Sequence, residues 1–192
     1  MDGSLFSLFE HIERLGTLSR AGMRRAGAPY GLQPVHLQAL LYLHQANRYS
    51  NTPQALVEYL GLTKGTVSQS LLLLVRRGLI ERYADQADKR LVRLSLSEEG
   101  EKLLKEIRLA PEWRQAARQI SDARLKTTSA ALRELLYGVQ ERSEIPTFGV
   151  CRSCSRCRRE GQRYHCDLTS ERLSLADLRK ICREHIPKGS QT

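Results

Sequence analysis

The chain has 192 residues, a formal net charge of +10 and a hydrophobic fraction of 41%, which together predict one folded domain with room for a small appendage and exclude a chain disordered throughout. The positive charge favours a polyanionic partner, of which nucleic acid is the usual one, although many basic proteins bind none. No apolar run approaches the roughly 20 residues that cross a bilayer, and the N-terminus lacks the basic-then-apolar order of a signal peptide, so we expect a cytoplasmic protein without a membrane partner.

The first predicted element is an amphipathic helix over residues 4–26. Its apolar side chains recur at helical spacing and form a single stripe, made of Leu5, Leu8, Phe9, Ile12 and Leu15. The segment 27–31 contains two glycines and Pro29, which predicts a break. A second helix is expected after it, with Pro34 in its first turn and leucines at 37, 40, 41 and 43.

Two short helices joined by a tight turn are predicted between residues 52 and 77. Thr52 stands before Pro53, which is a favourable pair for the cap and first position of a helix. Gly61 can adopt the left-handed conformation that ends this helix, and Thr63 is placed to cap the next one. The second helix then carries apolar residues at the spacing of a buried stripe, namely Val67, Leu71 and Leu74. The pattern is that of a helix-turn-helix.

A β-hairpin is predicted after Gly78, the residue that stops the second helix. Its strands are the segments 79–83 and 91–96, and the second strand alternates apolar with polar residues. The stretch between the strands, 84–90, is polar and ends in a basic tip. A helix-turn-helix followed by such a hairpin is a winged helix.

Two further helices are predicted to close this domain. Acidic residues at 98, 99 and 101 favour a helix N-terminus, and Pro111 is expected to kink or restart that helix. Ser121 and Asp122 open the last helix, whose apolar face comprises Leu125, Leu132, Leu135, Leu136 and Val139. Residues 141–149 are polar, contain Pro146 and indicate a linker.

Residues 63–100, TKGTVSQSLLLLVRRGLIERYADQADKRLVRLSLSEEG, resemble the MarR (multiple antibiotic resistance regulator) family, and the resemblance extends over about residues 4–140. Its most specific part is the wing tip, Asp88-Lys89-Arg90, followed by Leu94, Leu96, Ser97 and Gly100. The resemblance implies that the helix after the turn enters the DNA major groove and that the wing arginine reaches the adjacent minor groove. The matching DNA-binding positions are Thr63, Lys64, Thr66, Ser68 and Gln69 on the helix, with Lys89 and Arg90 on the wing.

The chemistry of these side chains agrees with that role. Gln69 can address an adenine edge through two hydrogen bonds, and the hydroxyls of Thr66 and Ser68 can reach phosphates or bases. Arg90 would meet the negative potential of a narrow minor groove, whereas we expect Asp88 to brace the wing arginine or the backbone. The alternative is that the charged residues of this set are ordinary solvated side chains.

The resemblance also implies a homodimer built from the first and last helices of the shared region. These are the stripes Leu5 to Leu15 and Leu125 to Val139, which alternatively are buried within one chain. One feature departs from the family pattern, because Leu72 and Leu73 stand where relatives usually carry charges. We hypothesise that the C-terminal module or another helix packs on these two leucines, the alternative being that they are simply exposed.

All five cysteines lie after residue 150: Cys151, Cys154, Cys157, Cys166 and Cys182. Clustered cysteines in a cytosolic chain indicate metal binding or redox work rather than structural disulfides. Two thiolates at Cys-x-x-Cys spacing can grip one metal, and more distant ligands then complete a tetrahedron. We expect Cys154, Cys157, Cys166 and Cys182 to be the ligands, which leaves Cys151 spare, with His165 and His185 as substitutes.

The metal is left open between two classes. Four cysteines suit zinc, which is the expected cofactor, but the close cysteine spacing is also similar to iron–sulfur ligation. Segment 173–181 has helical spacing at Leu175, Leu178 and Ile181, which predicts a short helix that presents Cys182 at its end. Unligated thiols on a disordered basic tail are the remaining alternative.

The sequence therefore predicts a mainly α fold with a small β-wing, in which a winged helix-turn-helix is dimerised by its N- and C-terminal helices and carries a short Cys-rich metal module. The expected boundaries are 1–140 for the DNA-binding and dimerisation domain, 141–149 for a linker, 150–187 for the metal module and 188–192 for a disordered tail.

The predicted function is sequence-specific regulation of transcription by a dimeric repressor, with double-stranded DNA as its partner. It would respond to a small-molecule effector or to the state of the metal site. One alternative is a redox- or iron-sensing iron–sulfur regulator, and another is a non-regulatory protein-interaction module with a zinc knuckle. We find no nucleophile–base set, phosphate-binding glycine loop or paired carboxylates in the sequence, so an enzyme is not expected.

Overall fold

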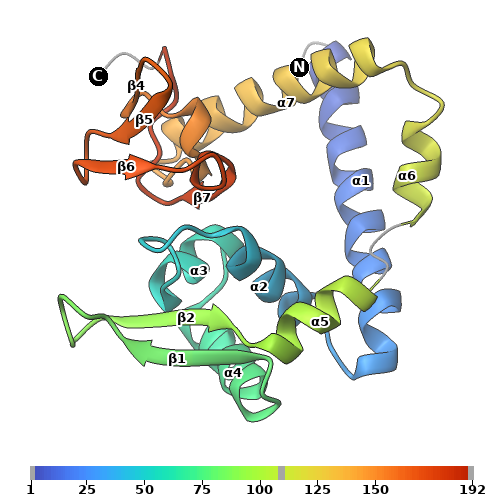
Figure 1. The fold of residues 1–192 in the computed structure, drawn as a ribbon. Helices are drawn as coiled ribbons and strands as arrows, with labels where there is room; N and C mark the ends of the chain where they lie inside the picture. Colours follow the sequence, from blue (N-terminus) through green and yellow to red (C-terminus); the bar gives the residue numbers. More distant parts are fainter. Residues whose placement is uncertain (1–2, 108–110, 190–192) are drawn as a thin grey trace.

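The computed structural model describes residues 3–107 and 111–189 of the chain (Figure 1). Its first part holds five helices, a short 3-10 turn and a two-stranded hairpin: α1 Gly3–Gly27, η1 Ala28–Tyr30, α2 Pro34–Gln45, α3 Pro53–Leu60, α4 Lys64–Arg76, β1 Ile80–Ala84, β2 Val92–Leu96 and α5 Glu98–Glu106. This order confirms the predicted winged helix-turn-helix in a mainly helical fold. Among the helices of the described ranges, none is long and apolar enough to cross a membrane.

Local chemistry explains why α3 and α4 form where they do. The Thr52 hydroxyl accepts a hydrogen bond from the Ala55 amide at the start of α3, and Thr63 does the same for Thr66 at the start of α4. Each bond satisfies one of the amides that a helix N-terminus leaves without a partner. Gly61 has φ 62° and ends α3, a left-handed conformation that favours glycine. All three predicted turn signals are confirmed.

One hydrophobic core joins α2, α3, α4 and the wing. Its most deeply buried apolar side chains include Leu37, Leu40, Leu56, Leu74 and Leu94, each at most 1% exposed. The predicted α4 stripe is also buried, because Val67, Leu71 and Leu74 all face this core. Burying a leucine side chain contributes about 1.5–3 kcal/mol, so these contacts fix the position of α4 against α2.

The wing is an antiparallel pair of strands, β1 and β2, in which Ile80 lies opposite Leu96 and Ala84 lies opposite Val92. Helix α5 starts directly after β2, where the Ser97 hydroxyl accepts a hydrogen bond from the Gly100 amide. The Ser97 amide donates to the Leu79 carbonyl, which ties the start of α5 to the base of the wing. The hairpin is therefore anchored at its base and projects from the domain (Figure 1).

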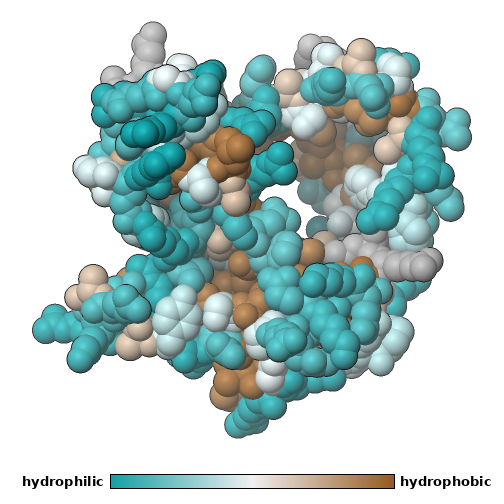
Figure 2. All heavy atoms as spheres, viewed as in Figure 1, coloured by the Kyte–Doolittle hydropathy of each residue, from teal (hydrophilic) through white to brown (hydrophobic). Residues whose placement is uncertain are grey.

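Two long helices lie above the winged domain. After α6, Pro111–Ala117, helix α7, Asp122–Arg142, runs back from the free end of α1 across the top of the molecule (Figure 1). Both long helices leave apolar side chains at least 39% exposed: Leu5, Phe6, Leu8, Phe9, Leu15 and Leu18 on α1, and Leu132, Leu136 and Val139 on α7. Figure 2 shows hydrophobic residues gathered where α1 and α7 approach each other. Among the described residues of a single chain, no element covers these side chains.

Residues 147–189 form a small unit that we call the cysteine module. Its elements are short: β3 Gly149–Val150, η2 Cys151–Ser153, β4 Cys157–Glu160, β5 Arg163–Cys166, β6 Glu171–Leu173, η3 Asp177–Arg179 and β7 Ile181–Cys182. Strands β4, β5 and β6 form one antiparallel sheet, and β3 pairs with β7. Leu178, 1% exposed, is its most deeply buried apolar residue. Of the predicted tail at 188–192, residues 190–192 lie outside the described ranges.

The helix predicted over residues 173–181 is wrong. The Ser174 amide and hydroxyl donate to the Asp177 carboxylate, and the Asp177 amide donates to the Ser174 hydroxyl, which starts a helical turn. Only the 3-10 turn η3 follows, because Ile181 is drawn into strand pairing with Val150. Tertiary pairing therefore overrides the helical spacing of Leu175, Leu178 and Ile181.

The hypothesis that the cysteine module covers Leu72 and Leu73 is also wrong. Leu73 packs at the edge of the main core, and Leu72 stays 37% exposed. The module instead lies on the opposite side of the domain, against α2, α3 and the segment that joins them (Figure 1). Two of its apolar residues, Phe148 and Ile181, belong to the main hydrophobic core.

Candidate nucleic-acid interface and cysteine module

The five predicted contact residues of α4 all lie on its solvent face. Thr63, Lys64, Thr66, Ser68 and Gln69 are exposed, whereas the intervening Val67 and Ser70 are buried. The hydroxyls of Thr63 and Thr66 are 2.9 Å apart, and the Thr63 hydroxyl also caps the helix. The structure therefore brings these side chains together on a fixed helix and leaves their polar ends open to a partner.

The wing tip is ordered by two aspartates. The Asp85 carboxylate accepts hydrogen bonds from the amides of Ala87 and Asp88 at 2.9 and 3.0 Å, and the Asp88 carboxylate accepts one from the Arg90 amide at 3.0 Å. Asp88 thus braces the backbone, as expected. The predicted contact residues Lys89 and Arg90 are exposed at this tip, so their charges can reach a polyanion while the loop that carries them is held.

A buried ion pair at the base of the tip was missed by the sequence reasoning. Arg93 on β2 is 9% exposed, and its Nε donates to the Asp85 carboxylate at 2.7 Å. Hydrogen bonds from the Asp88 amide and from Arg93 hold the pKa of Asp85 below its ordinary value. The available signal was an arginine that alternates with apolar residues along a strand, eight positions after an aspartate.

A second missed residue is Asn51, which precedes the cap of α3. Its amide group donates to the Leu94 carbonyl at 2.9 Å and to the Tyr83 hydroxyl at 3.1 Å, and its side-chain oxygen accepts from Arg93 at 3.3 Å. Asn51 therefore holds both strands of the wing. A polar residue in a loop carries no sequence signal for contacts that are more than 30 positions away.

The structure gathers the five cysteines in the cysteine module. Cys157 and Cys166 lie opposite each other on β4 and β5, and Cys151 and Cys154 stand at the two ends of η2. All five are free thiols. Within residues 3–107 and 111–189, no group of three or more cysteine, histidine or acidic side chains has the arrangement that would hold a metal ion. The expected ligands are thus neighbours without being positioned as a tetrahedron.

The contact between Cys151 and Cys182 is the most specific one among these thiols. A hydrogen bond from Cys151 lowers the pKa of Cys182 although burial opposes this, and the same bond raises the pKa of Cys151. The charges of Cys154 and Cys166 also raise the pKa of Cys151, which places all four thiols in one neighbourhood. Cys151, expected to be spare, therefore lies next to three of the other cysteines.

The two histidines considered as substitute ligands have other partners. The ring nitrogens of His185, a residue 4% exposed, lie 3.1 Å from the Thr147 hydroxyl and 3.0 Å from the Ser153 hydroxyl. Gly149 packs on this ring so closely that an added side-chain carbon would come within 2.4 Å of it. His165 faces Glu160 at 3.7 Å. His185 is built into the module as a packing residue.

A set of specific contacts fastens the module to the winged domain. Arg183 pairs with Glu58 of α3 through two nitrogens, one of them at 2.9 Å, and Lys180 donates to the His44 carbonyl at 2.7 Å. Glu171 pairs with Arg48 and accepts a hydrogen bond from Tyr49. These charges looked solvated in the sequence because their partners are up to 136 positions away.

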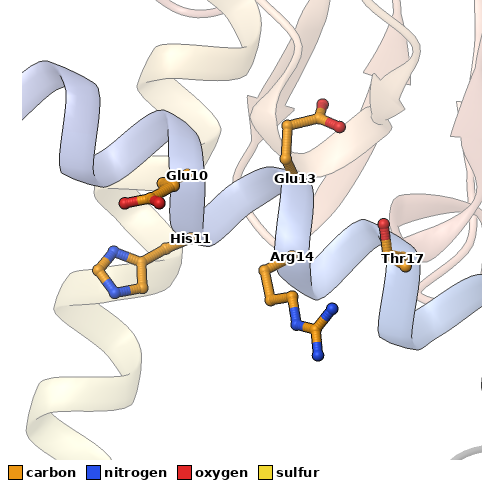
Figure 3. Close-up of a pocket in the computed structure, with 5 residues that line it drawn as sticks. All are labelled: Glu10, His11, Glu13, Arg14 and Thr17. Carbon is orange, nitrogen blue, oxygen red and sulfur yellow. The ribbon is translucent and has the colours of Figure 1, made fainter.

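Two hollows in the surface differ in what they can bind. A cleft of about 700 Å³ lies between α2, α3, α7 and the start of the module, and Tyr42, Tyr59, Val139 and Phe148 are among its lining residues. A second hollow is formed by Glu10, His11, Glu13, Arg14 and Thr17, which all project from α1 (Figure 3). Because one helix alone lines the second hollow, it cannot enclose a ligand.

Comparison with known proteins identifies the fold of the winged domain. Residues 30–91 match the model of the MarR family. The fold is similar to a MarR transcriptional regulator from Methanosarcina mazei, at 24% identity and TM-score 0.58, covering 69% of this chain and 96% of that chain. It is also similar to the MepR–DNA complex of S. aureus, at 22% identity and TM-score 0.54, covering 72% and 98%.

A third similar structure is CouR from Rhodococcus jostii bound to p-coumaroyl-CoA, at 20% identity and TM-score 0.58, covering 70% of this chain and 92% of that chain. No curated protein matches the chain. At these identities the likeness shows the fold, which is that of MarR-family transcriptional regulators.

Proposed function

Because residues 30–91 match the MarR family and the winged domain has the MarR fold, we propose that the protein is a sequence-specific, DNA-binding regulator of transcription that acts as a repressor. The observation that carries this proposal is the exposed polar face of α4 beside an ordered wing with a cationic tip. A helix of this kind fits the major groove, where Gln69 can pair with an adenine edge. Arg90 would then enter the adjacent minor groove.

The active form is proposed to be a homodimer. The exposed apolar faces of α1 and α7 support this, because a soluble chain rarely leaves so many large apolar side chains in water. A two-fold dimer would present two α4 helices to a pseudo-palindromic site, with half-sites about 34 Å apart along the duplex. The dimer helices therefore set the spacing at which the two recognition helices meet DNA.

The test begins with selection of a duplex by the full-length protein from a random library, followed by affinity measurements at several salt concentrations. Arg90→Ala should weaken binding and lower the salt slope by about one unit per subunit, which is about two units for the proposed dimer, whereas Gln69→Ala should relax the preference at one base pair of each half-site. Arg133→Ala removes an exposed arginine from α7 and serves as the charge-matched control. Selection of no duplex, or equal losses for Arg90→Ala and Arg133→Ala, would contradict the proposal.

The cleft between α2, α3 and α7 is the site that we propose for a small-molecule effector. Its lining is partly aromatic, with Tyr42, Tyr59 and Phe148, and Glu58 and Gln140 add polar groups. A flat, mostly apolar ligand with one or two hydrogen-bonding groups fits such a lining. A Tyr59→Ala variant should lose the response of operator binding to such a ligand while it retains affinity for the selected duplex.

We further propose that the cysteine module binds a thiophilic metal through Cys154, Cys157, Cys166 and Cys182. Five free cysteines within one small module and its very small apolar core support this, since units of this size usually need a metal to fold. Zinc is the proposed ion, and an iron–sulfur cluster is the alternative. Because Cys151 lies beside Cys182, Cys151 is an alternative to Cys157 as the fourth metal ligand.

Metal analysis with an absorption spectrum, on protein purified without oxygen, separates the outcomes. About one zinc per chain without visible absorbance supports the zinc site, and iron with sulfide supports the cluster. Cys151→Ser and Cys157→Ser then decide the fourth ligand, because only the true ligand reduces metal content when replaced. Metal-free protein with five titratable thiols would overturn this proposal and leave the DNA-binding proposal intact.

A further inference from the structure

The segment that joins α2 to α3, residues 46–52 and here called the α2–α3 loop, touches both the cysteine module and the wing. On the module side, the Asn47 amide donates to the Ile181 carbonyl at 2.9 Å. The Ser50 hydroxyl, in a residue that is 0% exposed, accepts a hydrogen bond from the Arg183 amide at 2.8 Å. The loop is therefore attached to the β7 end of the module, next to Cys182.

The same loop is attached to the wing through Asn51. The Leu94 amide donates to the Asn51 carbonyl at 2.8 Å, and the Asn51 side chain contacts Tyr83 on β1 and Arg93 on β2. Arg93 in turn pairs with Asp85, the residue whose carboxylate orders the wing tip. A continuous path of hydrogen bonds thus runs from the module to the loop that carries Lys89 and Arg90.

The loop is also bonded internally and to the core. The Asn47 side-chain oxygen accepts hydrogen bonds from the amides of Tyr49 and Ser50 at 3.1 and 2.9 Å. The Tyr42 hydroxyl donates to the Ser50 carbonyl at 2.7 Å from inside the core. Since packed segments of this kind shift between discrete arrangements rather than deform smoothly, a change on one side of the loop reaches the other side.

We infer that the cysteine module is the regulatory input of the DNA-binding site and that it acts on the wing through the α2–α3 loop. This inference rests on the proposed DNA-binding function. Cys182 lies between Ile181 and Arg183, whose carbonyl and amide bond to Asn47 and Ser50 of the loop, so chemistry that displaces Cys182 strains both of these contacts. Alkylation of Cys182 would have this effect. The docked module holds the wing ordered, and the undocked module releases it.

Because Arg183 and Asn51 lie on the same path, their contributions to wing order and to DNA affinity are interdependent. A double-mutant cycle detects such interdependence. The two readouts are hydrogen exchange of wing amides 85–91 and affinity for the duplex selected by the full-length protein. Arg183→Ala undocks the module, and Asn51→Ala breaks the link between loop and wing. Arg179→Ala removes an exposed arginine from the same module and is the matched control. Thermal unfolding of each variant verifies that it is folded.

Arg183→Ala is expected to speed exchange of the wing amides and to weaken duplex binding about tenfold, a typical strength for coupling between sites. In the Asn51→Ala background, the same substitution should change either readout less than twofold. Arg179→Ala should leave both unchanged. Should Arg183→Ala fail to fold, Glu58→Gln weakens the same ion pair from the α3 side and takes its place in the cycle.

Equal effects of Arg183→Ala in both backgrounds, or unchanged wing exchange when the module is undocked, would overturn the inference. Exchange at the wing is measured without DNA, so it separates the two proposals. A wild-type protein that selects no duplex but shows the coupled exchange refutes the DNA-binding function and supports the path. A protein that binds its duplex with uncoupled exchange does the reverse.

Discussion

Substitution of Phe148 tests whether the cysteine module packs on the winged domain as the structure shows. It is 9% exposed and belongs to the main hydrophobic core, although the chain places it beyond α7. Its ring centroid lies 5.3 Å from that of Tyr59 and 6.2 Å from that of Tyr42, both in edge-on geometry. Its backbone has φ 41°, in the left-handed region that a residue with a side chain rarely adopts.

Two substitutions separate the packing of Phe148 from its backbone conformation. Phe148→Ala removes the ring, and truncation of a buried phenylalanine costs about 3–5 kcal/mol. We expect a loss of about 3 kcal/mol, the lower end of that range, because the ring borders the open cleft and its neighbours can relax into the space. Phe148→Gly also removes the ring, but it relieves the left-handed backbone and should be about 1 kcal/mol more stable than Phe148→Ala.

The free energy of unfolding of each variant can be measured by urea denaturation followed by circular dichroism. The protein concentration must be the same throughout, since a dimer gains apparent stability with concentration. A loss below 1 kcal/mol for Phe148→Ala would refute the packing of the module on α2 and α3. A glycine variant less stable than the alanine variant would refute the left-handed conformation.

The other predictions concern the wing, the module and their connection. Arg90→Ala should lower operator affinity and reduce the salt slope by about one unit per subunit, and an unchanged slope in a salt titration would remove Arg90 from the phosphate and groove contacts. Gly149→Ala forces a side chain into the buried imidazole of the module and should destabilise the protein by about 1–3 kcal/mol. Gly138→Ala, inside α7 and near only a flexible arginine end, should stabilise by up to about 1 kcal/mol, so urea denaturation that ranks the two alike would contradict this packing. Burial of Glu58 opposes its ionisation, but hydrogen bonds from Arg183 outweigh burial and lower its pKa below the ordinary 4.5. The stability from this pair is therefore complete above about pH 5 and is lost as pH falls through the lowered pKa; Glu58→Gln should flatten the thermal stability profile in that acidic range, and an unchanged profile would count against the pair.

The winged domain could be predicted because its signals are local. Thr52, Gly61 and Thr63 each act on residues within four positions of themselves, through caps and a left-handed turn. The apolar stripe of α4 has a period that only a helix can bury on one side. Helix capping and apolar periodicity indicate the same structure here. A fold can be predicted from sequence when such independent signals agree.

The module and its attachment depend on contacts that no local pattern encodes. Arg183 and Glu58 are 125 positions apart, and Asn51 bonds to Leu94 of β2, which is 43 positions away. Each of these residues looks like a solvated polar side chain in the sequence, because burial of a charge becomes visible only with its partner. The helix predicted at 173–181 failed for a related reason, since the pairing of Ile181 with Val150 outweighs a helical spacing of three apolar residues.

The module also connects the wing to the helices of the proposed dimer. The His185 ring lies 5.3 Å from the ring of Tyr137 on α7, and the other face of the module is fastened to the α2–α3 loop. Helix α7 carries part of the exposed apolar surface that a second chain would cover, and two recognition helices must stand about 34 Å apart to read adjacent half-sites. The module therefore contacts both α7 and the α2–α3 loop, so it lies between the helices of the proposed dimer and the domain that holds α4. Loosening the module would relax the order of the wing through the α2–α3 loop, and this is the route that the double-mutant cycle of Arg183 and Asn51 measures.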